Sequence, residues 1–169
     1  AYAYVRKELS EIYHKGKIVN LYDLITDALQ RFDISIDEVL TFKSLYQILF
    51  VANEYASIHN DYSLVEPFLK KAYSFIAKNE QLAERHLYYH IYILYFMANI
   101  HFRNRRYSLS KEYLELMHRQ MGKQNGEYYW RFHIRYSLLL SLNENYAGNA
   151  DKAMSIAQQA LAKNKKADP

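Results

Sequence analysis

The sequence has no cysteine and contains little glycine or proline. Without cysteine the chain can form neither a disulfide framework nor a thiolate metal site, although this leaves the compartment open. Only 4 glycines and 2 prolines occur in 169 residues, whereas the many tight turns of a β-sandwich or barrel depend on these residues. Their scarcity favours long helices with few breaks.

Long apolar runs and a strong charge of one sign are also missing. No stretch of about 18 residues is free of strong polarity, so we expect no membrane insertion. The 22 basic and 18 acidic residues give a net charge of +4 and are scattered along the chain. A nucleic-acid-binding protein more often has a concentrated basic stripe, so we expect no nucleic-acid partner.

The N-terminal residues 1–7 do not have the pattern of a signal peptide, and the sequence begins without methionine. We therefore interpret it as an excised portion of a longer protein or as a processed start. We expect a cytoplasmic location.

The motifs of common enzymes are absent as well. The sequence contains neither of the glycine-rich phosphate loops nor the elbow of a serine nucleophile. His86 and His90 lie four residues apart and could share a metal ion, but no third ligand has a suitable spacing, so polar seam residues are the better interpretation. Carboxylate pairs such as Glu112 and Glu115 are typical of solvated helix faces. We expect no enzyme, no cofactor and no metal site.

Tyrosine is abundant, with 18 copies, and half of all residues are apolar. A tyrosine buries a large ring while its hydroxyl can still reach water, which suits the seams between packed helices. Tyrosine is also frequent at binding surfaces, but for any single tyrosine we favour the packing role.

Apolar residues recur at helical spacing along nearly the whole chain, which predicts an all-α fold. The pattern indicates eight helices, at residues 2–14, 19–31, 36–59, 64–78, 81–103, 109–122, 127–146 and 150–163. Within the fifth, residues 87–98 are apolar or aromatic on all sides, so this helix must be covered on most of its faces. A helix in the third of four stacked helix pairs would be covered in this way, because pairs pack against it on both sides.

Capping boxes mark two of the predicted helix starts. In Ser35–Glu38 and in Ser63–Glu66, the serine can accept from the third amide while the glutamate reaches back to the cap amide. Pro67 then falls in the first turn, where its missing N–H costs little. Residues 125–127, with the sequence Asn-Gly-Glu, mark a further start.

The second helices of the proposed pairs share apolar or small residues at steps of +3, +7 and +10. The four copies are Ile18, Leu21, Ile25 and Ala28; Tyr62, Val65, Leu69 and Ala72; Tyr107, Ser110, Leu114 and Met117; and Ala150, Ala153, Ala157 and Ala160. Successive copies begin 44, 45 and 43 residues apart. Each copy alone is one face of an amphipathic helix, but the near-constant period predicts an internal repeat.

These residues resemble the tetratricopeptide repeat (TPR) family, which uses the same spacing in its second helix. The family also has a turn glycine two residues before the first position of the pattern. Gly16 and Gly148 match it, while Asn60 and Arg105 stand there in the other copies. The period is longer than the family's usual length of about 34 residues.

The resemblance implies a TPR-like α-solenoid, a right-handed superhelical stack of about four antiparallel helix pairs. One domain would cover residues 1–169, with repeats at roughly 1–33, 34–79, 80–123 and 124–165. The first helices would line a concave groove, and the exposed end repeats would offer surfaces for homo-oligomer formation.

Nine first-helix residues would face this groove if the family's geometry applies. They are Gln47, Phe50 and Glu54 in the second repeat, Tyr92, Tyr95, Asn99 and Arg103 in the third, and Arg135 and Asn145 in the fourth. An asparagine amide can hold a peptide backbone through both its donor and its acceptor, so Asn99 is the first of them to test.

Two other features could contact a partner, one a basic cluster and the other a single tryptophan. Arg103, Arg105 and Arg106, with Lys111 nearby, could grip a phosphate or an acidic peptide, although a solvated turn explains them better. Trp130 is the only tryptophan and is interpreted as a core anchor rather than a contact residue.

Our leading hypothesis is a non-catalytic scaffold that binds a protein or peptide partner in the concave groove. The alternative is the ligand-sensing helical-repeat region of a larger bacterial transcriptional or signalling regulator. The flanking sequence of the full-length gene would discriminate between the two.

Overall fold

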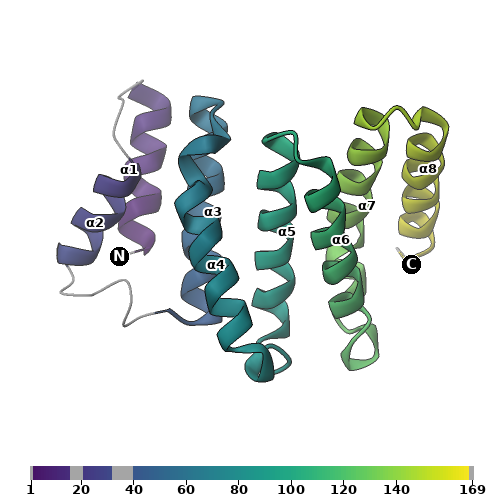
Figure 1. The fold of residues 1–169 in the computed structure, drawn as a ribbon, viewed down its shortest axis with the longest axis horizontal. Helices are drawn as coiled ribbons and strands as arrows, with labels where there is room; N and C mark the ends of the chain where they lie inside the picture. Colours follow the sequence, from purple (N-terminus) through teal and green to yellow (C-terminus); the bar gives the residue numbers. More distant parts are fainter. Residues whose placement is uncertain (1, 16–20, 32–39, 168–169) are drawn as a thin grey trace. The chain divides into compact units, whose positions relative to one another are not determined.

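The computed structural model describes residues 2–15, 21–31 and 40–167, and within these ranges the chain is helical with no strand. Neighbouring helices pack in pairs, as Figure 1 shows for α7 beside α8. The α-helices are α1 (Tyr2–Lys15), α2 (Leu21–Arg31), α3 (Phe42–His59), α4 (Glu66–Lys78), α5 (Leu87–Arg103), α6 (Tyr107–Met121), α7 (Tyr129–Tyr146) and α8 (Ala150–Ala167). Three short 3-10 helices, η1 (Tyr62–Val65), η2 (Glu80–Leu82) and η3 (Gln124–Gly126), lie between them.

The chain forms two compact units, residues 1–89 and 90–169. The first contains α1 to α4 and the start of α5, and the second contains the rest of α5 and α6 to α8. The all-helical prediction is confirmed.

The start of α3 differs from the prediction. Leu40 and Thr41 are not helical, so a continuous helix over 36–59 is wrong, and the capping box predicted at Ser35 lies outside the described residues. The helix begins instead after Thr41, whose Oγ1 accepts from the Ser44 amide at 3.1 Å while Ser44 Oγ accepts from the Thr41 amide at 2.8 Å. This reciprocal pair satisfies two amides that an α-helix leaves unbonded at its N-terminus.

The second predicted cap is also displaced. The capping residue is Asp61 rather than Ser63. Its Oδ1 accepts from the Ser63 amide at 3.0 Å and from Ser63 Oγ at 2.6 Å. These two hydrogen bonds lower the pKa of Asp61. A turn of 3-10 helix follows, so α4 begins only at Glu66, with Pro67 in its first turn as predicted.

The helix start predicted at residues 125–127 is also wrong, because α7 begins two residues later. Asn125 and Gly126 lie in η3 with positive φ angles of 58° and 74°, and α7 begins at Tyr129. A left-handed residue cannot continue an α-helix, so the two residues end one short helix before the next one starts.

The three described turns that join α3 to α4, α5 to α6 and α7 to α8 share one backbone geometry. Each has one residue with positive φ, namely Asn60 (51°), Arg105 (60°) and Gly148 (86°). The next amide donates to the carbonyl five residues back: Asp61 to Ala56 (3.1 Å), Arg106 to His101 (2.8 Å) and Asn149 to Glu144 (2.9 Å). This is the Schellman motif of helix C-termini, and it occurs at the positions that the sequence pattern aligned with the turn glycine.

Helix α5 is buried on most of its surface, as its apolar run predicted. Leu94 is 2% exposed, and Ile91, Ile93 and Met97 are inaccessible to solvent. Most of the repeated second-helix positions that the structure describes are buried, among them Ala28, Leu69, Leu114 and Ala160. Tyr107 and Ala157 are half-buried, and Ala150 is exposed. In the part of the chain that the structure describes, no helix is both long and apolar enough to cross a membrane.

Candidate functional site

A groove between α1 and α3 contains two of the predicted binding residues. Its volume is about 340 Å³ and its lining consists of Arg6, Leu9, Ser10, Phe50, Glu54, Ser57 and Ile58. Phe50 and Glu54 reach it because they lie four residues apart on one face of α3. Gln47 lies on the same face one turn earlier and is half-buried.

An arginine from α1 covers the aromatic ring in this groove. The Arg6 guanidinium carbon lies 5.0 Å from the centre of the Phe50 ring, and the Tyr2 ring packs edge-on against Phe50 at 6.4 Å. Arg6 is exposed. A guanidinium that lies over a ring is attracted by the ring face and still has its N–H edge directed outward.

The second unit has the same combination between α5 and α7. The Arg135 guanidinium carbon lies 5.6 Å from the centre of the Tyr92 ring, and Phe132 packs edge-on against Tyr92 at 4.7 Å. Tyr95 is half-buried and its ring lies 5.6 Å from that of Phe96. The structure thus brings together the predicted residues Tyr92 and Arg135.

The remaining predicted residues lie along the same helices but not in these clusters. Asn99 is half-buried on the α5 face that carries Tyr92. Arg103 is exposed at the end of α5, with its guanidinium carbon 6.0 Å from the Phe102 ring. Asn145 lies near the C-terminal end of α7, about 15 Å along the helix from Arg135, and its carbonyl accepts from Gly148 in the turn. The structure therefore does not place Asn145 beside Arg135.

The two histidines that could have shared a metal ion have different surroundings. His86 is exposed and stacks on Phe42 at 5.3 Å, whereas His90 is 6% exposed. Burial, with a smaller contribution from Lys123, lowers the pKa of His90 to about 4. Among the described residues, no group of three or more His, Asp or Glu side chains could hold a metal ion.

Trp130 is 53% exposed, so its interpretation as a core anchor is wrong. It lies in the first turn of α7, where Tyr129 packs edge-on against it at 5.5 Å and His133 at 5.1 Å. His133 is buried and its Nδ1 lies 3.1 Å from the Trp130 carbonyl oxygen. The sequence identified Trp130 as the only tryptophan but did not indicate that its ring faces water.

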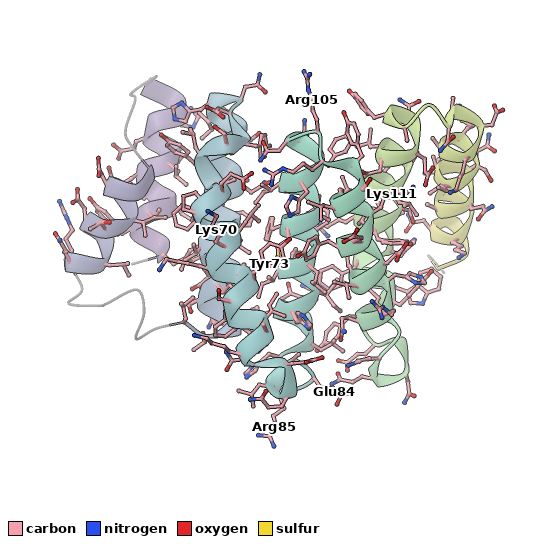
Figure 2. All side chains as sticks on the ribbon, viewed as in Figure 1. Lys70, Tyr73, Glu84, Arg85, Arg105 and Lys111 are labelled. Atoms are coloured by element: carbon pink, nitrogen blue, oxygen red, sulfur yellow. The ribbon has the colours of Figure 1, made fainter. Side chains whose placement is uncertain are left out.

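Lys111 was interpreted as part of a solvated basic cluster, but in the structure it forms a specific ion pair. Its Nζ lies 2.9 Å from Glu144 Oε1, and Lys152 Nζ lies 3.0 Å from the same oxygen. Asn149 donates to the other carboxylate oxygen at 2.8 Å. The Glu144 side chain is only 1% exposed, and these three donors lower its pKa to about 2. Figure 2 shows Lys111 on α6, and Arg105 extending away from the turn before it.

A shallow basic groove, which sequence reasoning missed, runs along α4. Its volume is about 590 Å³ and it is lined by Leu40, Lys70, Lys71, Ser74, Phe75, Lys78 and Asn79. Lys70, Ser74 and Lys78 follow at steps of four, which places them on one helix face. Figure 2 labels Lys70 on α4.

Comparisons with protein-family models, with curated proteins and with solved structures found no match for this chain.

Proposed function

We propose that the chain is a non-catalytic scaffold that binds a peptide segment of a protein partner along the faces of its first helices. One observation carries this proposal. In each unit an exposed arginine from one first helix lies over an aromatic ring of a neighbouring first helix, Arg6 over Phe50 and Arg135 over Tyr92. Three of these four residues, Phe50, Tyr92 and Arg135, belong to the predicted groove set, whereas Arg6 does not.

The chemistry of this pair suits a peptide. The aromatic ring beneath the guanidinium restricts the conformations of the arginine side chain. Less conformational entropy is therefore lost when the guanidinium N–H groups bind a carbonyl or carboxylate oxygen. Arginine and aromatic residues are also the types that contribute most to binding at protein interfaces. Around Arg6, the groove adds the hydroxyls of Ser10 and Ser57 and the carboxylate of Glu54. These groups can accept from backbone amides of an extended segment.

The test uses peptides selected for binding to the purified chain from a random display library. Their affinities for the chain and its variants are measured by fluorescence anisotropy. Arg6→Ala and Phe50→Ala, or Arg135→Ala and Tyr92→Ala, should weaken a selected peptide by tenfold or more, which corresponds to about 1.4 kcal/mol.

Arg31→Ala is the matched control, because the Arg31 guanidinium carbon also lies over an aromatic ring, that of Tyr4 at 4.9 Å, but on α2 rather than on a first helix. It should leave the affinity unchanged. A library that yields no binder, or binders indifferent to all four substitutions, would contradict the proposal.

The groove between α1 and α3 also favours a second candidate, the sensor region of a larger regulator. Its volume of about 340 Å³ falls within the lower part of the range of small-molecule sites, about 300–1,000 Å³. A screen of metabolites by thermal shift separates the two. A compound that stabilises the chain but not its Arg6→Ala variant would support a sensor, and a screen without such a compound would leave the scaffold.

A further inference from the structure

The basic groove along α4 contains two half-buried apolar side chains, Leu40 and Phe75. The Phe75 ring is held in position, because it packs edge-on at 5.1 Å against the ring of Phe42, which is itself buried. A ligand in this groove can therefore bury an apolar group of its own against a surface that is formed before it binds.

Three lysines give the groove its charge. Lys70 and Lys78 are exposed and Lys71 is half-buried, and the described residues that line the groove include no aspartate or glutamate. Three positive charges thus lie together in a chain whose net charge is only +4. A ligand with complementary charge is acidic.

The spacing of the lysines favours an extended ligand. Lys70 and Lys78 lie eight residues apart on one face of α4, which is about 12 Å along the helix. In an extended peptide, every second side chain points the same way, so the first and fifth residues lie about 13 Å apart on one face with the third between them. A single phosphate group would draw both lysines to one point and leave the apolar residues between them uncovered.

Polar groups suited to a peptide backbone lie in the same groove. Asn79 Nδ2 donates to the Phe75 carbonyl oxygen at 2.9 Å, which orients the side-chain amide, and its Oδ1 is an acceptor that a peptide N–H can use. Ser74 lies between Lys70 and Lys78 on the helix face and adds a hydroxyl that can donate or accept.

We propose that the α4 groove binds an extended acidic peptide segment of a partner protein. In this segment an apolar residue is flanked, two positions away on each side, by an aspartate or glutamate. The two carboxylates pair with Lys70 and Lys78, and the apolar side chain contacts Leu40 and Phe75. The arginine–aromatic pairs of the first helices take no part in this contact, so the inference does not rest on the function proposed above.

The test is an NMR titration of the purified chain with the capped peptide Gly-Glu-Ser-Leu-Ser-Glu-Gly. The amide signals of Ser74 and Asn79 should shift, with a dissociation constant below about 1 mM. The double variant Lys70→Gln/Lys78→Gln should weaken binding by about fivefold or more, since each exposed ion pair contributes modestly. Replacing the leucine of the peptide by serine should weaken binding by a similar factor, because the apolar contact is lost.

Lys7→Gln/Lys163→Gln is the matched control, because both lysines are exposed and lie on α1 and α8, outside the groove. It removes the same charge and should leave the affinity unchanged, as should Arg6→Ala. The proposal is overturned if the peptide does not bind at 1 mM, or if the control variant weakens binding as much as the groove variant. Equal binding of the rearranged peptide Gly-Leu-Ser-Glu-Glu-Ser-Gly, or of an oligothymidylate of the same charge, would also overturn it, because the groove would then attract any polyanion.

Discussion

The α5–α6 pair and the α7–α8 pair have the same turn, 43 residues apart, but different side chains at equivalent positions. Leu114 and Met117 fill the inner face of α6, whereas α8 has Ala157 and Ala160 there. At the equivalent position on the neighbouring face, α6 has the polar residue Lys111 and α8 has the apolar residue Met154. The pair with a following helix has large residues inside and polar ones at the contact, and the last pair has small residues inside and large apolar ones outside.

This difference teaches that the backbone of a pair and the surface that it offers are specified separately. The turn geometry depends on one left-handed residue and two hydrogen bonds. The residues beside the inner face determine which surface a pair offers to a partner. These residues differ between α6 and α8 although the turns before the two helices are the same. Four changes test how far the two pairs differ in stability.

The largest effect is expected for Leu94→Asp in α5. Leu94 is 2% exposed, and a buried carboxylate without a partner costs several kcal/mol. The variant should lose more than about 4 kcal/mol of unfolding free energy and be largely unfolded at 25 °C. Leu138→Asp on α7, measured at about 1 µM, should change stability by less than about 0.5 kcal/mol, because Leu138 is exposed. Similar melting curves by circular dichroism for both variants would mean that α5 is no more buried than α7.

The next effect is the acid sensitivity of α5 through His90. Burial lowers the pKa of His90 from 6.5 to about 4, so the folded chain binds fewer protons than the unfolded one between these values. The stability contribution is present above pH 6.5 and is lost as the pH falls to about 4, with a total of roughly 3 kcal/mol. Urea unfolding at several pH values should show this slope in the native chain, and a smaller one in His90→Leu. If the stability of the native chain and of His90→Leu depended equally on pH, His90 would be exposed to solvent rather than buried.

A smaller effect is expected for Glu144→Gln in α7. The three donors around this carboxylate lower its pKa from 4.5 to about 2, so its contribution is complete above pH 4.5 and is lost as the pH falls through 2. At pH 7 the substitution should cost about 1–2 kcal/mol, since two of the donors are partly exposed lysines and solvent screens the pair. Glu112→Gln, at an exposed position of α6, should cost almost nothing in the same urea titration.

The smallest effect comes from exchanging the turn residues of the two pairs. Arg105 has a φ of 60°, a conformation that costs a residue with a Cβ atom about 1 kcal/mol relative to glycine. Arg105→Gly should therefore raise the stability by up to about 1 kcal/mol, and Gly148→Ala should lower it by a similar amount. Differential scanning calorimetry would detect both shifts, and shifts of the same sign would show that the turns are not equivalent.

The sequence predicted the parts of this structure that depend on periodicity. The run at residues 87–98 indicated a covered helix, and the repeated spacing aligned Asn60, Arg105 and Gly148, which share one backbone geometry. Helix starts were less predictable because neighbouring Ser, Thr and Asp residues compete to cap the same amides. Asp61 forms the cap before η1, two residues before the serine of the predicted motif.

The candidate site was predictable only in part, because its contacts join residues far apart in the chain. The face of α3 that contains Phe50 follows from helical spacing, but nothing local indicates that Arg6 lies over it. Trp130 was assigned to the core because a large ring is usually buried. In the structure, however, its ring is 53% exposed.

The cluster around Glu144 has a consequence for how the last pair opens. One carboxylate receives Lys111 from α6, and Lys152 and Asn149 from the start of α8, while it belongs to α7 itself. A terminal helix held only by its own hairpin partner would exchange its amide hydrogens independently. Here, separation of α8 also breaks a contact shared with α6, so we expect the amides of these three helices to exchange as a single cooperative unit.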